Sequence, residues 1–251
     1  MSDLTGKTTV VVGATRGLGY GIATAFAQAG APVVAVGRSA TASEELPGAT
    51  GSIQPELADA SEPTAAARLL DRHDPQVVVL VAGATPHMRP LPDQTWETFS
   101  VNWNTDVRIS FYWLREALLR PLRAGSRVIV ISSGAAANPQ GSPLSGGYAG
   151  AKATQRFIAG YAQDAADRAG LGITFTAVLP QFAPQTGVGR PAVEAYAAQA
   201  GQSVADFLEG RPFPLLTPEI AGTALVELVQ ADPAGLSPAY LLNGAGLQQL
   251  P

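Results

Sequence analysis

The stretch of sequence that decides the fold is TTVVVGATRGLGYGIATAFAQ, residues 8–28. It begins with β-branched residues at 8–12, and because these are consecutive rather than alternating with polar residues, they predict a strand buried on both faces. Apolar residues at helical spacing follow at 18–28 and predict a helix. Residues 13–19 between them carry three glycines, so the stretch predicts a strand, a tight turn and a helix.

The same alternation of strand and helix continues along the chain. Strands are predicted at 32–36, 76–82, 127–132, 173–179 and 239–242, with a weaker one at 52–54, and helices at 63–70, 103–120, 148–169 and 218–229. Such alternation builds a parallel sheet covered by helices on both faces. We therefore expect one α/β domain over residues 1–251, with a Rossmann-type, doubly wound parallel sheet of about seven strands.

One segment interrupts the alternation. Residues 181–216 follow Pro180, contain Pro184, Pro191, Pro212 and Pro214, and include two short helical patches at 192–200 and 204–209. Ligands of open α/β sheets bind beyond the carboxyl ends of the strands. Because the segment follows such a strand, we expect 181–216 to be a substrate lid, with Gln181, Phe182 and Phe213 as candidate substrate contacts.

Composition narrows the function. With 16 basic and 20 acidic residues the net charge is −4, which argues against nucleic-acid binding because phosphates require clustered Lys and Arg. The absence of cysteine excludes disulfides and thiolate chemistry, and His73 and His87 are the only histidines, so no metal site is expected. No apolar run has the ~18 residues of a membrane helix, and residues 1–9 lack the order of a secretory signal. The expectation is a soluble cytoplasmic protein.

The glycine-rich turn has the properties of a dinucleotide-binding loop. Glycines permit positive φ angles and close approach of the backbone to a pyrophosphate, and the following helix presents unpaired N–H groups to it. A tight turn without a ligand is the alternative interpretation, since the spacing G-x-x-x-G-x-G is a weak signal alone. The residues predicted to contact the cofactor are Gly13, Thr15, Arg16, Gly17, Leu18 and Gly19.

The residue after the second strand distinguishes two dinucleotides. An Asp or Glu at that position binds the ribose hydroxyls of NAD, whereas this chain has Arg38. Arg38, helped by Arg16, is suited to a charge-assisted pair with the 2′-phosphate of NADP. The alternative is that both arginines are solvated surface residues. We expect the cofactor to be NADP(H).

A second motif carries chemistry. The sequence YAGAK places Tyr148 and Lys152 at positions i and i+4, hence on one face of a helix. The chain has two lysines and six tyrosines, so this spacing is expected by chance only about 0.05 times. Upstream, Ser133 ends a predicted strand and would bring a hydroxyl to the same edge of the sheet, although serine at a strand end is commonly only a turn former.

Together, the glycine loop, Ser133 and the Tyr148/Lys152 pair resemble the short-chain dehydrogenase/reductase family over nearly the whole chain. The resemblance implies that Tyr148 is the proton donor or acceptor, that Lys152 activates it and holds the nicotinamide ribose, and that Ser133 binds the substrate oxygen. It also implies that Asn102 supports a water and proton relay near the lysine, the alternative being an ordinary asparagine at a helix start.

The resemblance extends to further cofactor contacts. These are Glu56 and Leu57, in the acidic stretch Glu56-Leu57-Ala58-Asp59 beside the adenine, Ala82 and Gly83 after the fourth strand, and Pro180 after the sixth. Three features depart from the family: Leu80-Val81 replaces two asparagines, Gln181 replaces a glycine, and the spacing between Ser133 and Tyr148 is longer than usual. They indicate a divergent branch with different active-site walls.

The expected activity is NADPH-dependent reduction of a small-molecule ketone to an alcohol, or the reverse reaction. Two other functions stay open: a non-redox dehydratase, isomerase or epimerase of the same fold, and a nucleotide-binding regulator without chemistry. Members of the family associate through the long helices that correspond to 103–120 and 148–169, so the resemblance also implies a homodimer or homotetramer.

Overall fold

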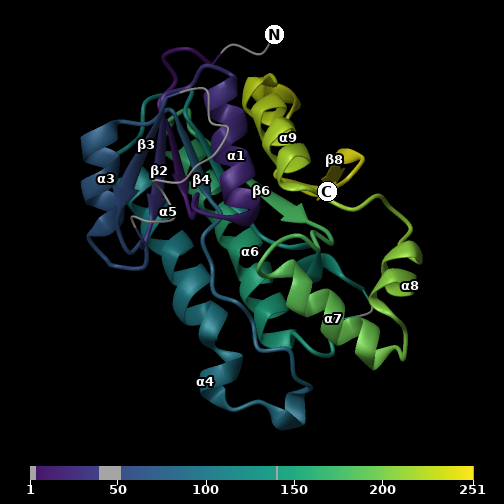
Figure 1. Cartoon of the computed structure of the whole chain (residues 1–251). Helices are drawn as coiled ribbons and strands as arrows, with labels where there is room; N and C mark the ends of the chain where they lie inside the picture. Colours follow the sequence, from purple (N-terminus) through teal and green to yellow (C-terminus); the bar gives the residue numbers. More distant parts are fainter. Residues whose placement is uncertain (1–3, 40–51, 140, 251) are drawn as a thin grey trace.

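A computed structural model describes residues 4–39, 52–139 and 141–250 (Figure 1), so both ends of the predicted 1–251 domain lie outside the described residues. One sheet runs through this part, in the order β3-β2-β1-β4-β5-β6-β7-β8. Its strands are β1 Thr9–Val12, β2 Val33–Gly37, β3 Ile53–Leu57, β4 Val77–Leu80, β5 Arg127–Ile131, β6 Thr174–Pro180, β7 Ala239–Asn243 and β8 Gly246–Leu250. β1 to β7 are parallel and β8 is antiparallel to β7. The doubly wound α/β fold is confirmed, with eight strands rather than about seven.

Helices cover both faces of the sheet. The helices are α1 Gly17–Gln28, α3 Ala65–His73, α4 Trp96–Phe99, α5 Arg108–Leu119, α6 Gly146–Arg168, α7 Gly189–Gln199, α8 Val204–Glu209 and α9 Pro218–Gln230. Shorter turns lie at η1 Leu91–Asp93, η2 Trp103–Val107, η3 Gly134–Ala137 and η4 Pro233–Gly235. α1 and α9 pack together on one face, and α3, α5 and α6 lie on the other (Figure 1). None of the helices in the described ranges is long and apolar enough to cross a membrane.

The consecutive apolar residues of the strands supply two cores. Side chains of successive strand residues point to opposite faces, so Val10 and Val12 enter the core beneath α3, α5 and α6, while Val11 enters the core beneath α1 and α9. All four residues of β1 and all four of β4 are buried. The central strands therefore form a rigid base that fixes the loops at their carboxyl ends.

The edge strands explain where the sequence prediction fell short. β3 contains Pro55, which cannot donate a hydrogen bond to a neighbouring strand and is tolerated because β3 is an edge strand. β8 was not predicted because Gln248 and Gln249 interrupt its apolar pattern. The sequence did hold a hairpin signal, Asn243-Gly244, just before β8, and the Asn243 side chain accepts a hydrogen bond from the Ala245 N–H in that turn.

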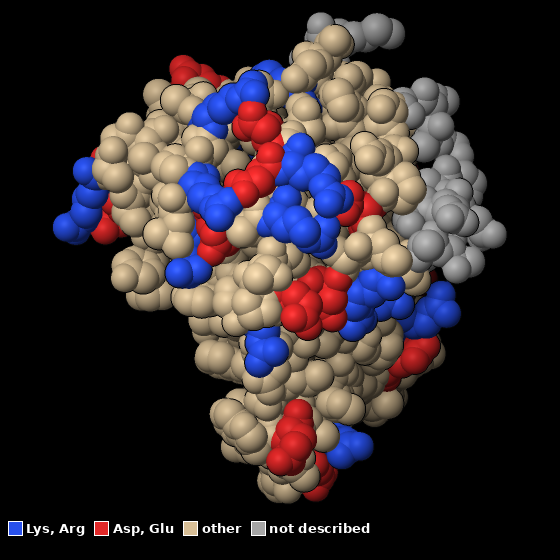
Figure 2. Space-filling view, turned by 90° about the vertical axis from the view of Figure 1, so that its left-hand side faces the viewer, with Lys and Arg blue, Asp and Glu red and all other residues tan. Residues whose placement is uncertain are grey.

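Figure 2 shows the face of the molecule on the left of Figure 1, where α3 lies. Acidic and basic side chains alternate across it rather than gathering by sign. Arg68 and Arg72 of α3 both pair with Glu56 of β3, and residues of α3 and its C-cap pair with arginines at and beyond the end of α5, as Asp71–Arg120 and Asp74–Arg123. These pairs fasten α3 to its neighbours, and the Asp71–Arg120 and Asp74–Arg123 pairs each contribute little because both partners are exposed.

The segment predicted as an insertion folds into α7, α8 and the irregular chain around them. Both helical patches expected from the sequence are present, although α7 begins at Gly189 rather than at 192. The two helices share a small core of Val193, Ala197 and Phe207, separate from the two main cores. In Figure 1 they lie at the lower right, whereas α3 lies at the left. The segment is thus a unit of its own, supported by β6 and by the loop that leads to α9.

Candidate active site

A large cavity lies at the carboxyl ends of the parallel strands. It has a volume of about 1140 Å³ and is lined by the segments that follow β1, β2, β4, β5 and β6. Its volume exceeds the range of ~300–1,000 Å³ usual for small-ligand pockets, so it has room for a ligand as large as a dinucleotide. It brings together most of the predicted residues: Gly13, Thr15, Arg16, Gly17, Leu18, Gly19, Arg38, Ala82, Gly83, Ser133, Tyr148, Lys152 and Pro180.

The glycine loop forms a cradle because its glycines leave no room for side chains. Gly13 has φ +93°, and a Cβ there would lie 2.6 Å from the Ala82 backbone at the end of β4. A Cβ on Gly19 would lie 2.0 Å from the Gly13 carbonyl oxygen. At the N-terminus of α1, Arg16 makes no side-chain capping bond. The first N–H groups of α1 therefore remain available to an anion in the cavity, which fits the pyrophosphate of a dinucleotide.

Arg38 lies at the β2 end of the cavity, opposite a short acidic loop. Asp59 and Ser61 line the wall there, and the Asp59 carboxylate accepts hydrogen bonds from the Ser61 N–H (2.9 Å) and hydroxyl (2.7 Å). These bonds from Ser61, together with the charge of Arg38, hold the pKa of Asp59 below its usual value. Asp59 belongs to the acidic stretch that the sequence places beside the adenine, whereas Ser61 was missed.

Glu56 and Leu57, predicted to lie beside the adenine, do not line the cavity. The Glu56 carboxylate instead faces α3, at 2.9 Å from Arg72 and 3.3 Å from His73. Burial raises the pKa of Glu56, but the hydrogen bonds and charges of His73 and Arg72 outweigh it, and the pKa is lowered overall. Leu57 is 59% exposed. The cavity wall at this point is formed by residues 58–61.

Tyr148, Lys152 and Ser133 meet at the end of β5. Tyr148 lies half-buried in the first turn of α6, and the Lys152 Nζ is 5.6 Å from the centroid of its ring. Ser133 is half-buried beside them at the start of η3. Its neighbour Ser132 donates a hydrogen bond from its hydroxyl to the Lys152 carbonyl at 2.7 Å, which fastens β5 to α6. The predicted hydroxyl, phenol and ammonium therefore share one wall of the cavity.

A carboxylate that sequence reasoning missed holds the lysine. The predicted helix at 103–120 begins with a π-helical turn, η2, and this turn brings Asp106 to 3.0 Å from the Lys152 Nζ. The side chains of Asp106 and Lys152 are 1% and 6% exposed. Asp106 also accepts a hydrogen bond from the Ala84 N–H at 2.8 Å. A Cβ on Gly83 would lie 2.5 Å from this carboxylate, so Gly83 makes room for it. π-Helical turns are frequent at functional sites.

Asn102 supports Asp106 rather than lining the cavity. Its amide donates to the Ala84 carbonyl at 2.8 Å and to the Asp106 carboxylate at 3.2 Å, and the residue is 1% exposed. Asn102 is therefore linked to Lys152 through Asp106. The sequence alone does not single out Asp106, because the buried residues of the helix that follows also include the polar Ser110 and the acidic Glu116.

The ammonium of Lys152 stays charged despite its burial. Burial lowers the pKa of Lys152, but the charges of Asp106 and Tyr148 and the hydrogen bond to Asp106 outweigh it, so the pKa lies above its usual value. Lys152 also donates to the Ile131 carbonyl at 3.3 Å. The arrangement presents a permanent positive charge beside a phenol at the cavity wall.

The segment from Gln181 to Leu216 forms the outer wall of the cavity. Thr186, also missed from the sequence, faces the glycine loop, since a Cβ on Gly17 would lie 3.5 Å from its side chain. Tyr196 of α7 has its hydroxyl 3.0 Å from that of Ser145, just before α6. Within the described ranges, no group of three or more His, Asp or Glu residues is arranged to hold a metal ion.

The sequence model of the short chain dehydrogenase family matches residues 7–197. The chain belongs to this family. The short-chain dehydrogenases bind a nicotinamide cofactor, act as oxidoreductases on small molecules and commonly form oligomers. The matched residues include the glycine loop, Asp106, Ser133, Tyr148 and Lys152, and all of these line the same cavity.

Individual short-chain dehydrogenases are similar to this chain. A hydroxynaphthalene reductase-like protein of Metarhizium robertsii is 34% identical over 188 residues, 71% of this chain and 68% of that protein. Versicolorin reductase 1 of Aspergillus parasiticus is 34% identical over 194 residues, 72% of each chain. A short chain dehydrogenase from Mycobacterium avium shares the fold, with a TM-score of 0.77 and 20% identity over 100% of this chain and 86% of that one.

The Asp106–Lys152 pair generates a prediction on stability. Asp106→Asn keeps the shape of the side chain but removes the counter-charge of a buried ammonium, and it should destabilise the fold by about 3–5 kcal/mol near pH 7. Because the folded pKa of Lys152 is raised, its stabilisation is complete below the unfolded value, about 10.5, and is lost as pH rises through the folded pKa. Urea unfolding from pH 7 to 11 measures this. The difference in free energy of unfolding between wild type and Asp106→Asn should become smaller above pH 10.5.

Asp164→Asn is the matched control, since Asp164 forms an exposed pair with Arg168 at 2.9 Å on the same helix as Lys152. It should change stability little at any pH. Equal losses in the two variants would contradict a stabilising role for the buried pair.

Proposed function

We propose that the protein is an NADP(H)-dependent reductase of a small carbonyl compound, or catalyses the reverse oxidation of an alcohol. The observation that carries the proposal is the phenol of Tyr148 on the cavity wall beside the buried, charged Lys152. Two similar proteins named as reductases support it. When bound, the nicotinamide would supply the hydride.

The chain's own residues divide the remaining tasks. The glycine loop and the uncapped N-terminus of α1 would hold the pyrophosphate, and Arg38 with Arg16 would hold the 2′-phosphate. Lys152 and Pro180 line the cavity at the end where the nicotinamide would lie. Glu56 and Leu57 are left out of this assignment because they lie outside the cavity.

Tyr148 would transfer the proton. Reduction builds negative charge on the carbonyl oxygen, and a phenol within hydrogen-bond reach neutralises that charge by protonating it. The Ser133 hydroxyl would donate a second hydrogen bond to the same oxygen. The phenolate left behind is stabilised by the nearby ammonium of Lys152, which Asp106 and Ile131 hold in place. Asn102 would serve by positioning Asp106.

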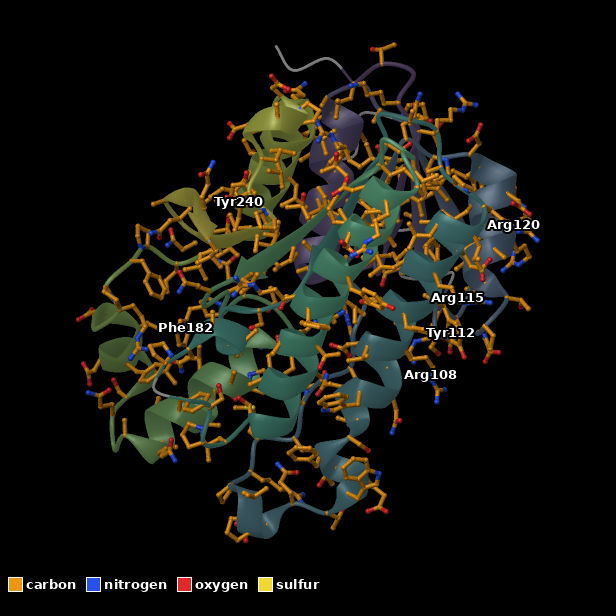
Figure 3. All side chains as sticks on the ribbon, turned by 180° about the vertical axis from the view of Figure 1, so that it is seen from behind. Arg108, Tyr112, Arg115, Arg120, Phe182 and Tyr240 are labelled. Atoms are coloured by element: carbon orange, nitrogen blue, oxygen red, sulfur yellow. The ribbon has the colours of Figure 1, made fainter. Side chains whose placement is uncertain are left out.

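We also propose a homo-oligomer built on α5 and α6. Phe111 and Leu119 of α5 are 52% and 60% exposed, and Phe157 and Tyr161 of α6 are 75% and 69% exposed. In Figure 3, Arg108, Tyr112 and Arg115 lie along the outer side of α5. Exposed apolar side chains such as those of Phe111, Leu119 and Phe157 mark protein–protein contacts when they gather on neighbouring helices. A solution mass equal to one chain would contradict this assembly.

Residues 181–216 would act as a lid. The segment has its own small core, and its bond from Tyr196 to Ser145 joins it to the start of α6. Hydrogen exchange within this segment should slow when NADP and substrate are both bound, because closure protects the backbone amides. Unchanged exchange would argue for a fixed wall.

The proton transfer is tested by Tyr148→Phe. This variant should bind NADPH with wild-type affinity, since it removes only the hydroxyl, yet lose at least about a hundredfold in kcat on any ketone that the wild type reduces. Tyr161→Phe, on the exposed side of the same helix, should keep full activity. Lys152→Ala should lose both activity and affinity for NADPH.

Two outcomes would contradict the assignment. Wild-type turnover by Tyr148→Phe would show that another group is the acid. Tight NADPH binding without oxidation over a panel of ketones, quinones and keto esters would favour the non-redox enzyme or the regulator over the reductase.

The cofactor preference is tested at Arg38. One good charge-assisted pair with the 2′-phosphate contributes about 1.5–3 kcal/mol, so NADPH should bind at least tenfold more tightly than NADH. Arg38→Asp should reverse this order, because a carboxylate repels the phosphate and accepts hydrogen bonds from ribose hydroxyls. Calorimetric titration of both cofactors measures the effect.

Arg190→Asp makes the same change of charge on α7. It should leave the preference for NADPH over NADH unchanged, since Arg190 is exposed and does not line the cavity. Equal affinities for NADPH and NADH in the wild type would contradict the preference.

A further inference from the structure

Besides Arg16, Arg38 and Lys152, a fourth cation lines the cavity, in the segment that follows β6. Arg211 follows α8, and its guanidinium carbon lies 4.1 Å from the ring centroid of Phe207 and 4.8 Å from that of Phe182. Its Nε donates a hydrogen bond to the Phe207 carbonyl at 3.1 Å. The stem and head of Arg211 are thereby held in one place at the edge of the cavity.

The terminal nitrogens of Arg211 lack a counter-charge. Among the described residues, no carboxylate lies within ion-pair distance of the guanidinium, and its Nε bond is the only hydrogen bond that it donates. Aromatic rings stack on a guanidinium without satisfying its N–H groups. The two terminal nitrogens therefore remain free to bind a planar anion through paired hydrogen bonds.

The backbone at Phe182 holds this arrangement under strain. Phe182 has φ +21°, a positive value that bulky residues rarely adopt because it is strained. Its carbonyl accepts a hydrogen bond from the Leu216 N–H at 3.1 Å, which ties the two ends of the lid segment together. Phe213 brings a third ring, 6.1 Å from Phe182. Strain of this kind persists where it preorganises a binding site.

Arg211 and the rings of Phe182, Phe207 and Phe213 form a cluster that lies away from Arg38, where the 2′-phosphate of the cofactor would bind. Phe182 follows β6 and Arg38 follows β2, and four strand spacings lie between β2 and β6. At about 4.8 Å per spacing, this is roughly 19 Å along the sheet. Figure 3 shows Phe182 beside the green helices α7 and α8, on the side of the molecule opposite the labelled residues of α5. Ser133 follows β5, the strand next to β6.

We propose that Arg211 binds the carboxylate of an aromatic carbonyl substrate, whose ring packs against Phe182 and Phe213. This inference rests on the proposed reductase function, since it names the class of substrate for the same cavity. The carbonyl group would reach Tyr148 and Ser133 at the end of β5, while the carboxylate would end at Arg211. The substrate class is therefore aromatic keto acids.

Binding of matched probes to the protein saturated with NADP⁺ tests the proposal without requiring turnover. The pairs are 4-acetylbenzoate with methyl 4-acetylbenzoate, benzoate with benzamide, and 2-naphthoate with 2-naphthamide, each titrated calorimetrically. We expect the carboxylate of at least one pair to bind about tenfold or more tightly than its neutral partner, since one charge-assisted pair is worth that much.

Variants assign the preference to one side chain. Arg211→Gln should abolish it and leave NADP⁺ affinity unchanged, which also shows that the variant is folded. Arg211→Lys, which keeps the charge but not the planar pair of donors, should retain only part of it. Arg190→Gln, an equal loss of charge on α7 outside the cavity lining, should retain all of it.

The proposal is overturned if no carboxylate binds more tightly than its neutral partner, or if the preference survives in Arg211→Gln. Weaker NADP⁺ binding by Arg211→Gln, with the carboxylate preference intact, would assign Arg211 to a cofactor phosphate instead. The test is independent of the reductase activity: if Arg211 selects carboxylates but no ketone oxidises NADPH, the anion site stands and the reductase fails. If neutral ketones are reduced but no carboxylate is preferred, the reductase stands and the anion site fails.

Discussion

The buried ion pair between Asp106 and Lys152 is the constraint on which the rest of the site depends. Removing two charges from water is costly, so the pair is stable only where further donors and acceptors complete it. The Ala84 N–H and the Asn102 amide do this for the carboxylate, and the Ile131 carbonyl does it for the ammonium. These partners come from the segment after β4, from the start of η2 and from β5. One electrostatic contact thus fixes the relative positions of three parts of the cavity wall.

The sheet makes such a contact possible. β4 and β5 are buried adjacent parallel strands, so their carboxyl ends present Gly83 and Ser133 side by side. Ser132 then ties β5 to α6 through the Lys152 carbonyl. The polar side chains of the site therefore gather at the strand ends, above the two apolar cores.

The sequence predicted what depends on local pattern. The buried strands, the glycine loop and the Tyr148/Lys152 spacing are periodic or short-range features, and the structure agrees with them. The sequence could not predict Asp106, because a helix pattern does not show where a π-helical turn rotates one residue toward a lysine 46 positions away. Glu56 illustrates the opposite case. The sequence identified the acidic stretch to which it belongs, but could not show that its side chain faces α3 rather than the cavity. β8 was missed because Gln248 and Gln249 interrupt its apolar pattern, so that its pairing with β7 is what defines it as a strand.

The contact between Gly83 and Asp106 has an evolutionary consequence. A Cβ at position 83 would lie 2.5 Å from the Asp106 carboxylate, so a side chain at 83 would displace the group that neutralises Lys152. A single substitution at either position would leave the buried lysine without its partner or the chain with a clash. The two positions, 23 residues apart in the chain, should therefore vary together among relatives, and lineages would change them only through paired or intermediate steps.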